Sequence, residues 1–460
     1  MKCLSGEVSA ENIVSRSLPL CRQPTMRIAL ERYFEFSRLG TNWRTEVLAG
    51  VTTFLTMAYI VAVNPAILAQ SGMPLPAVTA ATCLSAAFGS ILMGIVARYP
   101  IALAPGMGLN AYFTYTVCIK MHIPWQTALG AVFLSGTVFL LLTAFGIRQL
   151  ILKSIPQELY AAVACGIGLF IAFIGLTKAG LVVKSPETLV QLGNIKDPNT
   201  ALALLGLGVM VALEIWKVKG SILIGVLVVT GVAWGMGLVH WVPAAGGVES
   251  LTATAFKLDI PGALRVGLVE IVFVFFFVDL FDNLGTLVAV TKRAGLLAQD
   301  HSIPRLNRIL FADAAATVAG SLTGTSTVTS YVESTAGVAA GGRSGVTAIV
   351  TGLLFLVAMV AAPFIGIVPT AATAPALILV GSMMLTTVTE IRWTDPLVAV
   401  PAFLTLILIP LTYSIANGLG FGIIAWATLH IVAGKFTRKD WLLYLLAALF
   451  LVRFLYLSAS

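Results

Sequence analysis

The chain has 460 residues, of which 58% are hydrophobic and only 10% are charged, and its mean hydropathy is +0.97. A soluble domain carries about 25% charged residues, and a single soluble core stops growing at roughly 250–300 residues. The composition therefore excludes an ordinary soluble protein and predicts a polytopic, all-α membrane protein.

The formal net charge of +8 does not indicate a nucleic-acid partner. The basic residues gather beside the ends of apolar segments, which is the pattern that orients a membrane chain. With the N-terminus in the cytoplasm, nearly all of these clusters fall on the cytoplasmic side of the cell inner membrane. The main exceptions, which we expect outside, are Lys178, Lys184 and Lys196.

Residues 1–45 are expected to form a cytoplasmic N-terminal segment, within which Met26 is a candidate start of the folded chain. The first 25 residues lack the apolar region of a signal peptide. The five cysteines show no CxxC spacing. We therefore expect no disulfide framework, no metal site and no cofactor.

A membrane-spanning helix needs about 20 mostly apolar residues. The first half of the chain, 46–241, offers 46–68, 76–97, a short 102–118, 124–146, 156–177, 199–216 and 220–241. The second half, 264–433, offers 264–291, a short 308–322, a Ser/Thr/Gly-rich 325–341, 345–367, 371–388, 396–413 and 416–433. The C-terminal segment 434–460 adds an apolar stretch at 441–457 that either crosses the membrane or lies at its surface.

The two halves share an unusual feature. In each, the third segment is weakly hydrophobic and interrupted by Gly or Pro, at 100–110 and at 320–335. Seven spans per half place the second half in the opposite orientation, so the pattern predicts an inverted-topology repeat. Matched interrupted segments in such repeats indicate a binding site near the middle of the membrane.

Acidic residues inside the predicted spans form a small cluster. Asp279 and Asp282 share a helix face in the eighth span, which Asn283 and Thr286 extend by one turn. Glu333 lies in the tenth segment. A carboxylate at the bilayer centre costs about 2.5–3.5 kcal/mol even on a lenient scale. Such residues are therefore expected to face a cavity.

These residues suit a carrier that couples cargo to protons, because burial and a neighbouring carboxylate both raise the pKa of an acid toward neutrality. A carboxylate, the Asn110 amide and bare backbone at Gly106 and Gly108 match the mixed donors and acceptors of a purine. Structural roles stay open as alternatives: close helix packing for the glycines, and a helix break for Asp282.

Two further acids are weaker candidates. Glu270 lies near the start of its span, where an interfacial position explains it as well as a transport role does. Glu214 stands beside Trp216 and Lys217 at a span end and is expected to be a solvated anchor.

At these residues the chain resembles the nucleobase–cation symporters of the uracil/xanthine permease superfamily, in the hypoxanthine–adenine–guanine permease branch. The resemblance covers roughly residues 40–435. It is carried by AGVTTFLTMAYIVAVNPAIL (49–68), APGMGLNAYF (104–113), FVDLFDNLGTL (277–287) and GTSTVTSYVESTAGVAAGGRSG (324–345).

The resemblance implies a fourteen-span fold with a core domain and a gate domain, an elevator-like movement and a homodimer. It also implies a short extended piece followed by a half-helix in the third and tenth segments.

Matching motifs assign substrate binding to Glu333, Asp279, Asn110 and Gly108, and coupling to Asp282 and Thr286. Adenine-selective members of the branch tend to carry Asn at the position of Asp279. The resemblance therefore favours hypoxanthine and guanine, with adenine as a further possible cargo.

Three other functions agree less well with the sequence. An anion exchanger of the same general fold is the main alternative, but three intramembrane carboxylates and no buried Arg or Lys speak against an anion site. A channel is disfavoured by the inverted repeat with broken helices. Four His without metal-ligand spacing and no nucleophile motif speak against an enzyme.

Overall fold

The fold was analysed in a computed structural model that describes residues 26–145, 156–239, 248–265, 268–296, 303–360, 367–435 and 440–456. In the first half the elements are α1 (Met26–Tyr33), α2 (Phe36–Leu39), α3 (Trp43–Met57), α4 (Ile60–Leu68), η1 (Ala69–Ser71), α5 (Leu75–Leu92), η2 (Met93–Ala97), β1 (Leu103–Pro105), α6 (Met107–Ala111), η3 (Tyr112–Lys120), α7 (Trp125–Ala144), α9 (Gln157–Lys178), β2 (Val182–Ser185), β3 (Leu189–Leu192), α10 (Pro198–Ile215) and α11 (Ser221–Gly235).

In the second half they are η4 (Val248–Ala253), α12 (Ile260–Ala263), α13 (Leu268–Ala294), α14 (Leu306–Thr323), β4 (Val328–Ser330), α15 (Ser334–Ala339), α16 (Gly345–Met359), α17 (Thr370–Met384), η6 (Leu385–Glu390), α18 (Pro396–Thr412), α19 (Ile415–Val432) and α20 (Trp441–Tyr456). Two of the η elements, η2 and η3, are π-helical, and the others are 3₁₀ helices.

Each expected apolar segment coincides with helical structure in the described residues, including the short third and tenth segments. Within the part of the chain that the structure describes, seven helices are long and apolar enough to cross a membrane, and four more apolar helices are shorter. The chain is therefore a multi-pass, all-α membrane protein. The stretch expected at 441–457 is helical, and the Phe454 ring of α20 stacks on Phe421 of α19 at 4.8 Å between centroids.

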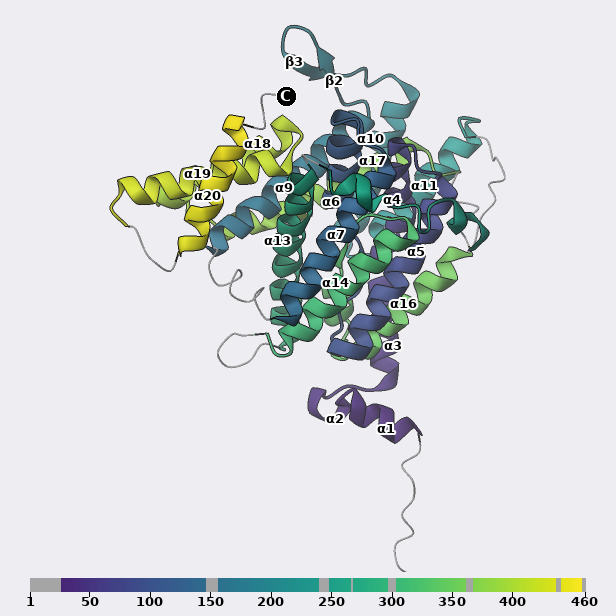
Figure 1. The fold of residues 1–460 in the computed structure, drawn as a ribbon. Coiled ribbons are helices and arrows are strands. Elements are labelled where there is room, and N and C mark those ends of the chain that lie inside the picture. Colours follow the sequence, from purple (N-terminus) through teal and green to yellow (C-terminus); the bar gives the residue numbers. More distant parts are fainter. Residues whose placement is uncertain are drawn as a thin grey trace, which may run out of the picture.

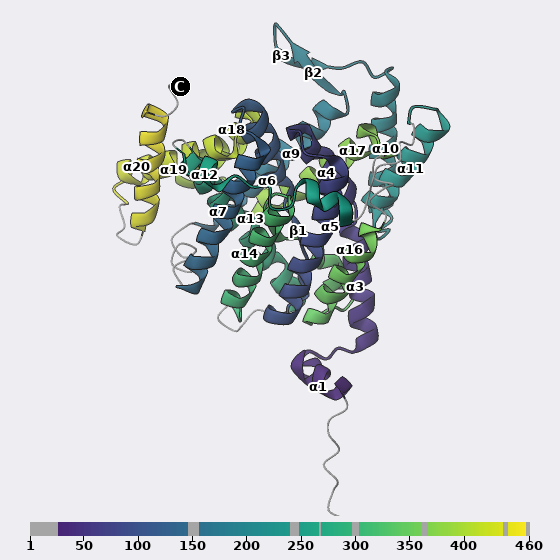
Figure 2. The same cartoon turned by 45° about the vertical axis from the view of Figure 1, so that its right-hand side comes forward.

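The spanning helices pack in two groups. In the strand-bearing group, α3, α4, α5, α7, α13, α14 and α16 surround the third and tenth segments. In the flanking group, α9, α10, α11, α17, α18 and α19 pack mainly on one another. Figures 1 and 2 show α3, α5 and α16 side by side in one part of the molecule and α18, α19 and α20 together in another.

Small residues let the strand-bearing helices approach closely. A side chain at Gly50 of α3 would meet Val350 Cβ of α16 at 2.6 Å, and one at Gly352 of α16 would meet the carbonyl of Ala87 in α5 at 2.8 Å. Such contacts bring backbones together where lipid provides no hydrophobic driving force between helices. The group is thus packed tightly around the segments that it holds.

The two ends of the molecule differ (Figure 1). Helices α1 and α2 lie at one end, below α3, and the β2–β3 hairpin lies at the opposite end. We call these ends the N-terminal side and the hairpin side. The hairpin, in which Val182 pairs with Leu192, was not predicted from the sequence.

The N-terminal helices dock on the strand-bearing group through Glu35. Its carboxylate pairs with Arg38 at 2.5 Å, with Arg98 at 3.4 Å and with Arg305. Burial raises the pKa of Glu35, but hydrogen bonds and charge from Arg305 and Arg38 outweigh burial and leave that pKa below its ordinary value. The segment expected as cytoplasmic, 1–45, is therefore tied to the bundle at Glu35.

Candidate functional site

The two interrupted segments meet in a two-stranded antiparallel sheet. Strand β1 pairs with β4, with Leu103 opposite Ser330 and Pro105 opposite Val328. The Gly106 N–H continues the ladder by donating to the Thr327 carbonyl at 2.9 Å. Residues more than two hundred positions apart are thereby joined at the centre of the strand-bearing group (Figure 2).

Side chains satisfy the outer edges of this small sheet. Ser90 of α5 accepts from the Leu103 N–H at 2.9 Å, and Thr317 of α14 donates to the Val328 carbonyl at 2.8 Å. The Tyr331 hydroxyl donates to the Pro105 carbonyl at 2.5 Å. Extended backbone at membrane depth requires such partners because lipid offers none. These hydroxyls explain why Ser and Thr are frequent in this part of the sequence.

A short helix follows each strand. Helix α6 carries Gly108 and Asn110 and continues as the π-helical η3, and Glu333 is the residue that precedes α15. The expected order of an extended piece followed by a half-helix is therefore present in both segments. The pairing of the two extended pieces was not predicted.

Asn110 is fully buried in a network of neutral side chains. Its amide nitrogen donates to Asn64 Oδ1 at 2.5 Å, and its own Oδ1 accepts from the Ser326 hydroxyl. Asn64 in turn donates to Thr82 at 2.7 Å and to Thr325 at 3.1 Å. In this conformation the Asn110 amide thus links the third segment, α4 and the start of the tenth segment.

Glu333 is half-buried and has a neighbour in the first span. The Tyr59 hydroxyl donates to Glu333 Oε1 at 2.5 Å. Tyr59 lies where α3 gives way to α4, a junction at which Val61 and Ala62 donate to carbonyls only three residues back. These shorter-range hydrogen bonds interrupt the regular α-helix of the first span beside the Glu333 carboxylate.

Helix α13 places Asp279 beside the same segments. It packs against α15 and β4, and its Phe275 ring lies 5.3 Å from the Tyr112 ring of η3. Asp279 is 1% exposed and Asn283, one turn later, is fully buried. Thr286 is partly exposed. The side chains of Asp282 and Glu270 lie outside what the structure describes.

Gly108 faces the flanking group. A side chain at this position would meet Ile167 Cγ2 of α9 at 2.5 Å. Gly108 therefore allows α6 to lie directly against α9, and close helix packing, the alternative left open above, accounts for the glycine in this conformation.

Several buried hydroxyls around the sheet have no hydrogen-bond partner among the described residues: those of Thr53, Thr327, Thr329 and Ser330. Buried polar groups are normally hydrogen-bonded. Three of these hydroxyls, those of Thr327, Thr329 and Ser330, lie on or directly before β4. The tenth segment thus carries hydroxyls with no described partner shortly before Glu333 in the chain.

Comparison with known proteins identifies the chain. The family model Xan_ur_permease, described as Permease family, matches residues 44–419. The chain belongs to this family. It is a transporter and not an enzyme.

Curated relatives align over almost the whole permease. The guanine/hypoxanthine permease PbuG of Bacillus subtilis (strain 168) is 45% identical over 93% of this chain and 100% of its own length. The adenine permease AdeP of Escherichia coli (strain K12) is 41% identical over 94% and 97%. The transmembrane domain of the cyanobacterial bicarbonate transporter BicA shares the fold, with a TM-score of 0.63 and 15% identity over 83% of this permease and 97% of that domain.

Sequence reasoning about the permease missed three residues that the structure brings to the segments. Tyr59 and Asn64 fall within the motif at 49–68, but neither is charged, and nothing in the sequence shows what they contact. Glu46 is fully buried at the start of α3. It accepts from the backbone N–H groups of Arg343 and Ser344 at 3.0 and 3.1 Å, so it holds the two residues that precede α16, of which Ser344 is the N-cap.

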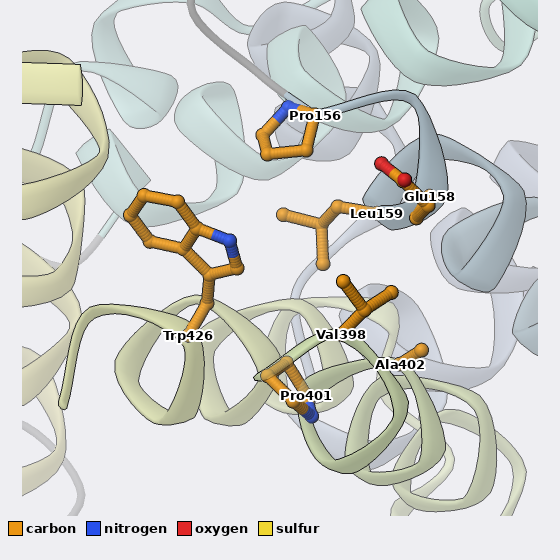
Figure 3. A pocket seen from close by; sticks show the side chains of 7 residues that line it. All are labelled: Pro156, Glu158, Leu159, Val398, Pro401, Ala402 and Trp426. Atoms are coloured by element: carbon orange, nitrogen blue, oxygen red, sulfur yellow. The ribbon is translucent and has the colours of Figure 1, made fainter. Parts of the chain in front are cut away.

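A small pocket in the flanking group of the permease lies away from the paired strands (Figure 3). It is lined by Pro156, Glu158, Leu159, Val398, Pro401, Ala402 and Trp426. Most of these side chains are apolar, and they come from the start of α9 and from α18 and α19. Among the described residues no group of His, Cys, Asp and Glu could hold a metal ion.

Proposed function

We propose that this permease takes up purine nucleobases together with protons, with hypoxanthine and guanine preferred and adenine a further cargo. The observation that carries the proposal is the Glu333 carboxylate, which Tyr59 holds in a segment that also carries the unpaired hydroxyls of β4. A carboxylate accepts hydrogen bonds from purine N–H groups, and hydroxyls can both donate to and accept from ring and exocyclic atoms. Relatives named as guanine/hypoxanthine and adenine permeases support the same class of cargo.

We assign the residues as follows. Glu333 is the principal purine ligand, and Asp279 on the adjacent α13 is the second acidic contact. The Asn110 amide is already satisfied by Asn64 and Ser326, so in this conformation it positions the third segment. We assign direct contact with the base, by Asn110 and by the Gly108 backbone, to another conformation. In that conformation the two helix groups have separated. Asp282 and Thr286 are assigned to the coupling of purine transport to protons.

We infer the movement during transport from the division of the helices into two groups. We assign the strand-bearing group as the core domain and the flanking group as the gate domain of a fourteen-span, 7+7 inverted repeat. The core then slides against the gate and carries the site across the membrane by alternating access. The cytoplasm is assigned to the N-terminal side, and the permease is expected to act as a homodimer in the cell membrane.

The alternative is an anion exchanger, suggested by the BicA-like fold. Elements β1, α6, β4 and α15 contain no Lys or Arg, so an anion would find no basic side chain on them. Fold likeness at 15% identity does not carry a cargo with it. The acidic site therefore favours the purine over bicarbonate or sulfate.

Uptake of labelled hypoxanthine in a transport-null host tests the proposal. Unlabelled guanine should compete best, adenine less, and xanthine, uracil, bicarbonate and sulfate little. A protonophore should abolish accumulation, whereas removal of Na⁺ should matter little. No purine uptake at confirmed surface expression would overturn the cargo, and full accumulation without a proton gradient would overturn the coupling.

A further inference from the structure

The two helix groups are bridged on the hairpin side by side-chain hydrogen bonds. The Thr116 hydroxyl of η3 donates to the Tyr413 carbonyl at 2.6 Å. Two lysines add weaker or more exposed links. The bonds are Lys120 Nζ to the Thr412 carbonyl at 3.4 Å and Lys178 Nζ to Gln70 Oε1 at 2.5 Å.

The acceptors are the free carbonyls at the end of a gate helix. Helix α18 ends at Thr412, and Tyr413 follows with φ 51°, a left-handed conformation that is uncommon for a bulky residue. Carbonyls of a last helical turn have no partner within the helix, and a cation is favoured beside them. Thr116 and Lys120, which belong to the other helix group, therefore donate the hydrogen bonds that the carbonyls at the end of α18 lack.

The Thr116–Tyr413 contact is enclosed. Thr116 is 5% exposed, and the Tyr413 ring lies 5.6 Å from both Phe170 and Phe173 of α9. A cavity of about 340 Å³ opens beside the contact, lined by Tyr115, Ile119, Lys120, Leu411, Thr412 and Tyr413. The hydrogen bond thus lies at a recess between the two groups.

On the opposite side of the molecule, the described residues form fewer side-chain hydrogen bonds between the two groups. There the described side-chain bond between the groups is that of Lys219 Nζ to Thr52 Oγ1, at 3.2 Å. Sliding of one group past the other would break these hydrogen bonds on both sides.

We propose that Thr116, Lys120 and the α18–α19 junction form a latch that closes the transport path on the hairpin side. The inference rests on the proposed movement of the two helix groups. The latch breaks each time the site becomes accessible from that side, and Thr116 is its buried centre.

Cys118 is a native, half-buried cysteine two residues from Thr116. Its reactivity can therefore report the opening of the latch. In a chain whose other cysteines are replaced by Ala, reconstituted in nanodiscs without purine, the rate of maleimide labelling of Cys118 is measured. Thr116→Val keeps the side-chain shape and removes the donor. A lost hydrogen bond of ordinary strength should raise the labelling rate roughly two- to tenfold.

Two further variants make the result decisive. Thr116→Ser keeps the hydroxyl and should label like the parent chain. Thr79→Val removes a buried hydroxyl that bonds only the Leu75 carbonyl of its own helix, and it should leave labelling unchanged. Equal rates for Thr116→Val and Thr79→Val, or fast labelling of Thr116→Ser, would overturn the latch. Labelling uses no purine, so its outcome is independent of a failure of the cargo proposal in the uptake assay.

Discussion

The Tyr59 hydroxyl and the Glu333 carboxylate are 274 positions apart in the chain and 2.5 Å apart in the fold. Tyr59 stands at the turn inside the first span, and Glu333 precedes the short helix of the tenth segment. The hydrogen bond orients the Glu333 carboxylate. Glu333 is therefore positioned by a residue that lies in the other half of the sequence.

Glu333→Gln should weaken the apparent affinity for hypoxanthine roughly tenfold or more. The exchange keeps the shape but replaces an acceptor oxygen with a donor, and a mismatched buried polar contact costs about 1–3 kcal/mol. Glu333→Asp keeps the charge on a shorter arm and should retain part of the function. Uptake at equal surface expression measures both. Unchanged affinity in the Gln variant would remove Glu333 from the site.

Tyr59→Phe should lower hypoxanthine affinity about two- to tenfold without lowering the amount of protein in the membrane. It removes one donor to the carboxylate and retains the ring, which is fully buried. The double variant Tyr59→Phe, Glu333→Gln measures the coupling. If Tyr59 acts through Glu333, the double variant should be no worse than Glu333→Gln alone, whereas additive losses would show an independent role.

Gly108→Ala should impair transport because its new methyl group lies 2.5 Å from Ile167 Cγ2. Ile167→Val keeps Cγ2 and would leave the clash, so the matched second-site change is Ile167→Ala, which removes it. If Gly108 serves packing between α6 and α9, uptake by the double variant should recover. Persistent loss of purine affinity after Ile167→Ala would instead indicate that the backbone at Gly108 approaches the substrate.

Asn64→Leu should destabilise the protein by several kcal/mol. The change strips hydrogen-bond partners from Asn110, Thr82 and Thr325, and each buried polar group left unpaired costs about 1–3 kcal/mol. Thermal unfolding in detergent measures the loss. Thr137→Val on α7, whose hydroxyl bonds only the Phe133 carbonyl of its own helix, serves as the control and should unfold near the parent temperature. Equal stability of the Asn64 variant would contradict the network.

Glu35→Gln should loosen the N-terminal helices, and the effect should depend on pH. The pKa of Glu35 is lowered in the fold, so its contribution is present above the ordinary value near 4.5 and is lost as the pH falls through the lower, folded value. Partly exposed ion pairs of this kind contribute roughly 1–2 kcal/mol together. Limited proteolysis near residue 33 should therefore be faster in the variant at pH 7, and the difference from the parent chain should shrink as the pH is lowered through the folded pKa. A variant protected like the parent at pH 7 would show that the apolar contacts of Phe34 and Phe36 suffice.

The sequence by itself determined the membrane class, the places of the spans and the two interrupted segments. These features depend on local composition, since twenty apolar residues can be read without knowing what they contact. Glu333 and Asp279 also stood out, because a charged residue in an apolar segment can be recognised from the sequence alone.

Only the tertiary structure decided which residues meet. The pairing of β1 with β4, the Asn64 network, the contact of Glu46 with Arg343 and Ser344 and the Tyr59–Glu333 bond all join residues across long separations. A tyrosine or an asparagine in a span has no distinctive pattern until its partner is known. The physical reason is that hydrogen bonds in a membrane core are satisfied between helices, and the choice of partner depends on how the two halves of the chain pack.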